Sequence, residues 1–177
     1  MHSDKKQSVV ALFFGILLLT GCTPVVDRHP LDKKYLADDS DSQLDFWHTL
    51  ATKKLATHDE SFHALLLYLD SHDQSESYQD RKKVMMARRM LPSDFSGQAD
   101  EAITRGTISV AISKILQIKG GVMMHLLNKS PRYACRELQN MGVLPQSSPN
   151  QVVSGAELVG IIGKLEDFQS DKNGAGK

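Results

Sequence analysis

The chain of 177 residues is poor in aromatic residues and carries no net charge. Phe, Trp and Tyr make up 6% of it, and 21 basic residues balance 21 acidic ones. Nucleic-acid binding needs a concentrated basic surface, and single strands also need aromatic platforms on which bases stack. A nucleic acid is therefore excluded as the expected partner.

Cysteines and membrane-length apolar runs are also scarce. The two cysteines are Cys22 and Cys135, too few for a disulfide framework. The apolar run from Val9 to Leu19 has 11 residues, whereas a membrane-spanning helix needs roughly 20. Because Lys5 and Lys6 precede this run, the pattern is typical of a secretory signal peptide.

The apolar run ends in Leu19-Thr20-Gly21-Cys22. An aliphatic residue and two small residues before a cysteine resemble the lipobox of bacterial lipoproteins. The resemblance implies that residues 1–21 are removed, that the Cys22 sulfur receives a diacylglyceryl group, and that the new amine is acylated. It implies a lipid-anchored protein of the cell envelope, and Thr23 favours the outer membrane in a Gram-negative cell. An ordinary signal peptide with a chance cysteine is the alternative.

Anchoring would then depend on the lipid alone. One acyl chain binds a membrane only marginally, at about 0.8 kcal/mol for each buried methylene, so several chains on one cysteine are needed. Removal of residues 1–21 leaves 19 basic and 20 acidic residues, so no electrostatic attraction to the membrane is indicated. Residues 22–40 contain Pro24 and Pro30 and no apolar periodicity, which predicts a flexible tether.

Residues 41–168 are predicted to form a mainly all-α domain, because apolar residues recur at helical spacing. Expected helices cover 42–55, 57–69, 78–90, 104–115, 130–142 and 154–165. The apolar stretch from Ile118 to Leu127 fits a short buried strand or a short helix equally well. Residues 169–177 are polar and rich in glycine, which predicts a disordered tail.

A unit of helix, Leu-Pro loop and capped helix occurs twice, at about 78–118 and 130–168. Thr104 and Ser154 are each placed to cap a second helix, and the two helices match at an offset of 50 residues. Ser154 and Glu157 have the spacing of a capping box, in which hydroxyl and carboxylate satisfy each other's backbone amides.

The unit resembles the surface-layer homology (SLH) repeat. In that family the first helix ends Leu-x-x-x-Gly-Ile, and the second opens with Thr-Arg-Ala-Glu. Leu138 to Val143 matches the first signature and Thr104-Arg105 part of the second, while Thr107 and Gly155 depart from it. The resemblance implies that repeats assemble in threes, although only two are visible, and that the arginine helps bind acidic cell-wall carbohydrate.

The binding candidates are therefore Arg105 and Thr104, followed by Arg132 and Arg136. No catalytic residue, cofactor or metal site is expected, because no nucleophile, acid–base pair or phosphate loop has a recognisable spacing. His58 and His63 lie five residues apart, and a zinc site needs three or four converging ligands. Cys135 is expected to be a small buried apolar group.

Three hypotheses remain, of which two are non-enzymatic; the third is an enzyme, for which the sequence identifies no nucleophile, acid–base pair or metal ligand. In the first, the SLH-like domain of an envelope lipoprotein binds a cell-envelope polymer, such as a cell-wall polysaccharide, or a protein partner. In the second, the repeats are degenerate, no polymer binds, and the protein has a structural or protein-interaction role through an apolar groove near Val122–Met124.

Overall fold

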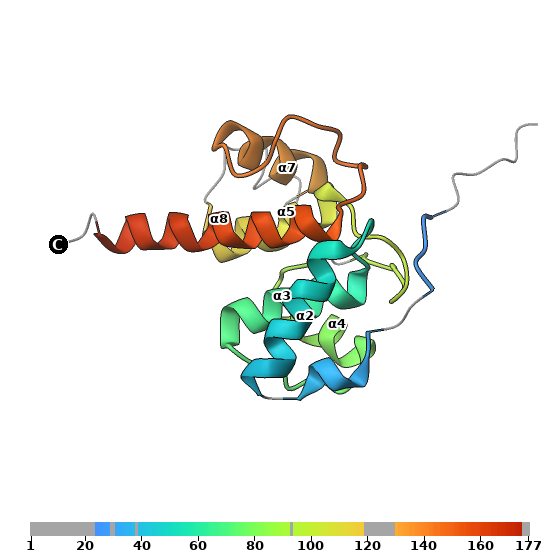
Figure 1. Ribbon diagram of the computed structural model, residues 1–177. Helices are drawn as coiled ribbons and strands as arrows, with labels where there is room; N and C mark the ends of the chain where they lie inside the picture. The colour runs from blue at the N-terminus through green and yellow to red at the C-terminus, as the bar shows by residue number, and fades with distance from the viewer. Residues whose placement is uncertain (1–23, 29–30, 38, 93, 119–129, 175–177) are drawn as a thin grey trace, which may run out of the picture.

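A computed structural model describes residues 24–28, 31–37, 39–92, 94–118 and 130–174 (Figure 1). Helices fill most of these ranges, and the extended pairs among them are isolated bridges, so the predicted all-α fold is confirmed. The elements are η1 (Lys33–Leu36), α2 (Ser40–Thr52), α3 (His58–Asp70), α4 (Tyr78–Ala87), α5 (Arg105–Ile115), α7 (Pro131–Asn140) and α8 (Gly155–Gly174).

Three of the sequence predictions lie outside the described residues. These are the signal peptide with the lipid site at Cys22, the strand or helix after Ile118, and the groove near Val122–Met124. Within the described ranges, no helix has both the length and the apolar character that crossing a bilayer requires.

The helices form three helix–loop–helix units, which corrects the count of two made from the sequence. The units pair α2 with α3, α4 with α5, and α7 with α8. The second helix of each unit follows a fully buried extended residue, which is Ala56, Ile103 or Val153. The first unit escaped notice because only five residues separate its helices and they include no Leu-Pro pair.

Backbone hydrogen bonds join the three units in a closed ring. The amide of Ala56 donates to the carbonyl of Val153 at 2.9 Å, and the amide of Val153 donates to Ile103 at 3.0 Å. The amide of Ile103 donates back to Ala56 at 2.9 Å. Because buried backbone groups must be paired, this ring fixes where the three units meet.

The first residue of each second helix also bonds to the neighbouring unit. The amides of His58, Arg105 and Gly155 donate to the carbonyls of Glu101, Gln151 and Lys53, at 2.8, 2.8 and 3.0 Å respectively. The first amides of a helix have no partner within the helix. Each unit therefore satisfies the helix start of another, and the starts of α3, α5 and α8 gather around the ring.

One apolar core extends through all three units. Helix α5 packs against α7, α2 against α8, and α3 against both α4 and α8. Figure 1 shows α8 running between α7 and the group formed by α2, α3 and α4. Phe62, Ile108 and Leu158 are fully buried, and Cys135 is 1% exposed, which confirms its predicted apolar role.

The predicted tether is wrong for residues 24–28 and 31–37. Val26 pairs with Glu101 in an antiparallel bridge, and Tyr35 on η1 is buried with its ring 5.7 Å from that of Phe46. A single aromatic anchor on one short turn gives no periodic signal, so the sequence did not reveal this docking.

The prediction of a disordered tail over 169–177 is also wrong for residues 169–174, because α8 continues to Gly174, while residues 175–177 lie outside the described residues. Phe168 still packs against the core, and no proline interrupts the helix after it. Residues 169–174 therefore extend the last helix.

Two glycines of α8 test the ring geometry. A Cβ at Gly155 would overlap the carbonyl oxygen of Leu50 and lie 3.2 Å from Lys53 Cβ, whereas a Cβ at Gly160 meets nothing within 4 Å. We expect Gly155→Ala to lower the free energy of unfolding by about 1–3 kcal/mol through overpacking. Gly160→Ala should raise it by roughly 0.5–1 kcal/mol, because glycine is costly inside a helix. Urea denaturation measures both, and equal effects would contradict the close approach at Gly155.

Candidate functional site

Arg105, the strongest candidate from the sequence, is buried at the junction between two units. It is 7% exposed, and its Nη2 lies 2.7 Å from Oε1 of Glu157. Glu157 belongs to the predicted capping box, of which only one half forms. The amide of Glu157 donates to Ser154 Oγ at 3.2 Å, while its carboxylate pairs with the arginine. Arg105 thus connects the start of α5 to the start of α8.

The other predicted residues lie at the surface or at a groove. Thr104 caps α5 by accepting a hydrogen bond from the Thr107 amide at 3.2 Å. Arg132 and Arg136 are exposed, one turn apart on α7, and neither forms an ion pair or hydrogen bond with another described residue. The structure therefore separates the buried Arg105 from the two exposed arginines.

Thr104 lines a groove of about 460 Å³, here called the inter-unit groove. All three units contribute to its walls, together with the N-terminal segment. Its lining residues are Pro24, Val25, His58, Pro92, Asp94, Phe95, Ser96, Gly97, Glu101, Ala102, Thr104, Thr107, Pro131, Asn150 and Val152.

The inter-unit groove lies at a junction where the Arg105–Glu157 ion pair has no counterpart. Arg105 is the first residue of α5, and its partner Glu157 is the third residue of α8. The equivalent positions at the junction of the first two units hold His58 and Thr107, which both line the groove. Two shorter side chains of unlike chemistry replace the salt bridge, so this junction stays open.

His58 is fixed at the edge of this groove. Its Nδ1 lies 2.9 Å from the carbonyl oxygen of Gln98, and its ring contacts the rings of Phe62 and Phe95 at 5.8 and 5.0 Å. Burial lowers the pKa of His58 below its usual value, in spite of the Gln98 carbonyl and the nearby Glu101 carboxylate. The imidazole is therefore neutral at pH 7 and adds no positive charge to the groove.

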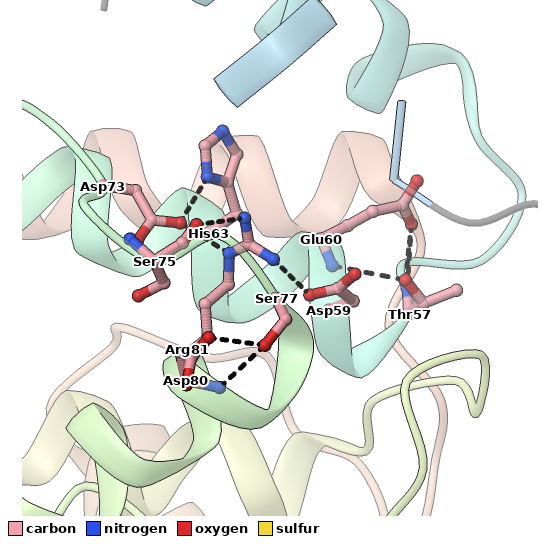
Figure 2. A network of polar contacts seen from close by, with 9 residues as sticks. All are labelled: Thr57, Asp59, Glu60, His63, Asp73, Ser75, Ser77, Asp80 and Arg81. Carbon is pink, nitrogen blue, oxygen red and sulfur yellow. Dashed lines mark hydrogen bonds and ion pairs between the residues drawn. The ribbon is translucent and has the colours of Figure 1, made fainter. Parts of the chain in front are cut away.

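A second polar cluster, drawn in Figure 2, joins α3 to α4. Arg81 is 1% exposed and pairs through Nε with Asp73 at 2.5 Å and through Nη1 with Asp59 at 2.8 Å. Nδ1 of His63 lies 2.7 Å from the same oxygen of Asp73. His63 is 1% exposed, so a substrate has no access to it. The ion pairs of Arg81 instead give the cluster a structural role, in which it connects α3 to α4.

Asp73 is ionised in this cluster. Burial alone would raise its pKa, but hydrogen bonds from His63, from the Ser75 amide and from Arg81 outweigh burial and lower the pKa to about 2. Burial does prevail at Asp59, where it raises the pKa despite Arg81.

A third feature is a groove of about 480 Å³ between α2, α3 and α8, here called the aromatic groove. Its lining residues are Gln43, Trp47, Leu67, Tyr68, Ser71, Val159, Ile162, Gly163 and Glu166. It shares no residue with the inter-unit groove. The sequence did not reveal it, because α8 is far along the chain from α2 and α3.

The described residues include no group of three or more His, Cys, Asp or Glu side chains placed to hold a metal ion. Comparisons with protein-family models, with curated proteins and with solved structures gave no match to this chain.

The Arg105–Glu157 pair predicts a structural role for the arginine. Arg105→Met leaves the partly buried carboxylate of Glu157 without its partner, so the free energy of unfolding should fall by about 2–4 kcal/mol. Adding Glu157→Gln should recover part of that loss, because the unpaired charge is removed. Arg132→Met, at an exposed site, should change the value by less than about 0.5 kcal/mol. Equal losses in urea denaturation from Arg105→Met and Arg132→Met would refute this role.

The Asp73 cluster predicts loss of stability in acid. The native pKa of about 2 lies below the unfolded value of about 3.9, so its contribution is complete above about pH 5 and declines as the pH falls towards 2. Asp73→Asn should lower the unfolding free energy at pH 7 and flatten its slope between pH 4 and pH 2. Asp94→Asn, at an exposed position, should keep the wild-type slope. A wild-type slope in Asp73→Asn would show that this carboxylate is not the group responsible.

Proposed function

We propose that this chain is a lipid-anchored, non-enzymatic protein of the bacterial cell envelope whose helical domain binds an envelope polysaccharide. The lipobox-like Leu19–Cys22 supports the anchor. The observation that carries the binding proposal is the closed arrangement of three units. Assembly in threes is what the SLH resemblance implies, and the sequence alone offered only two repeats.

The proposed polymer contacts are Thr104, Arg132 and Arg136. Thr104 and Pro131, the residue before Arg132, line the inter-unit groove. Arg132 and Arg136 present two guanidinium groups on one face of α7, each free of other described partners. Such groups pair with the carboxylate or phosphate of an acidic polysaccharide. Arg105 supports the site as a positioning residue, since its charge is taken by Glu157.

A protein-interaction role without polymer binding is the second candidate. The aromatic groove favours it, because Trp47 and Tyr68 are residue types that are enriched in the buried centres of protein interfaces.

Retention on purified, insoluble cell-wall polysaccharide tests the polymer proposal. Wild-type protein should be retained, and the double variant Arg132→Ala/Arg136→Ala should bind at least about fivefold more weakly. Lys54→Ala/Lys114→Ala removes the same charge from exposed positions elsewhere and is the matched control. Protein extracted from membranes should begin at an acylated Cys22 in mass spectrometry.

Two outcomes would contradict the proposal. Equal retention of the arginine and lysine double variants would show that Arg132 and Arg136 do not contact the polymer. If wild-type protein is not retained, the domain does not bind this polysaccharide. An unmodified chain that still begins at Met1 would refute the anchor.

A further inference from the structure

The aromatic groove has an apolar floor and a polar rim. Leu67 and Ile162 are 7% and 5% exposed, while Trp47 and Tyr68 are half-buried. Glu166 is exposed on α8. The volume of about 480 Å³ falls within the range of roughly 300–1,000 Å³ that is usual for ligand sites.

The polar groups of this groove have unused capacity to accept hydrogen bonds. The hydroxyl of Tyr68 is buried and has no hydrogen-bond partner among the described atoms. An unpaired buried polar group is unfavourable, and a bound donor would offset this cost. Gln43 donates through Nε2 to the carbonyl of Ser71 at 3.1 Å, which leaves its amide oxygen to accept.

The charge of the groove is negative. Glu166 is its only charged lining residue, and its carboxylate forms no ion pair or hydrogen bond within the described part of the chain. Burial and this carboxylate both raise the pKa of Tyr68, as expected for two acidic groups that interact. An acidic ligand would therefore be repelled.

The aromatic rings add an attraction for cations. The charged head of a Lys or Arg placed over a Trp or Tyr ring is attracted by the electrons of the ring face. The aliphatic part of such a side chain also covers apolar surface while its charge stays near water.

We infer that the aromatic groove is a docking site for a basic segment of a protein partner. A Lys or Arg side chain of that segment lies along Leu67 and Ile162, and its charged head meets Glu166 beside Trp47. The inference does not rest on the proposed polymer binding, because the two grooves share no residue. Either proposal can fail without the other.

Glycines on α8 provide a way to close the groove without disturbing the core. A Cβ at Gly163 meets nothing within 4 Å, and Gly163 lines the groove. Gly160, on the same helix, has equally open space but does not line it. Gly163→Leu therefore fills the groove, and Gly160→Leu is its matched control.

The chain has a single tryptophan, Trp47, so its fluorescence reports on the groove directly. We would titrate the full chain in phosphatidylcholine nanodiscs with the peptide acetyl-Leu-Lys-Leu-Lys-amide. The fluorescence should change saturably. Affinity should fall at least about fivefold in Gly163→Leu and in Glu166→Gln, and stay within about twofold in Gly160→Leu and in Asp167→Asn.

The inference is overturned if the basic peptide gives no saturable change. It is also overturned if acetyl-Leu-Glu-Leu-Glu-amide binds equally well, or if Gly163→Leu binds the basic peptide as wild type does. Saturation by N-acetylglucosamine with no response to the basic peptide would instead identify a saccharide site.

Discussion

The ring of backbone hydrogen bonds through Ala56, Ile103 and Val153 is the constraint on which the rest of the structure depends. All three residues are fully buried, so their amides and carbonyls have no access to water and must pair with one another. The ring closes only when all three units are in place. The first helical residue after each of them then bonds to a neighbouring unit, so α3, α5 and α8 begin around one centre.

Equivalent positions around this ring carry different side chains, and those differences distinguish the junctions. Arg105 and Glu157 close one junction with a buried ion pair. At the next junction His58 and Thr107 occupy the equivalent positions, and both line the inter-unit groove. At the third, Gly155 lets the backbone of Leu50 approach closely, and the carboxylate of Glu60 pairs with Lys53 instead. A near-symmetric backbone thus presents three different surfaces.

Local sequence signals predicted the helices well, because apolar spacing and caps act over a few residues. The caps at Thr104 and Ser154 and the burial of Cys135 followed from such signals. Long-range features were out of reach. From the sequence, Arg105 resembles a ligand-binding residue. In the structure it pairs with Glu157, which lies 52 positions further along the chain. The capping box of Thr57 and Glu60 was a local sign of the first unit, the one absent from the sequence prediction, but the short loop between α2 and α3 concealed the repeat.

Native-state hydrogen exchange at the amides of Ala56, Ile103 and Val153 tests the closed ring most directly. If the ring holds the three units as one cooperative body, all three amides exchange only through global unfolding. The opening free energy, RT times the logarithm of the protection factor, should then be the same at all three amides and equal the unfolding free energy from urea denaturation. Gly155→Ala should lower all three values together. A protection factor at one of them that is more than about tenfold lower than at the other two would contradict the account, because a unit would then open alone.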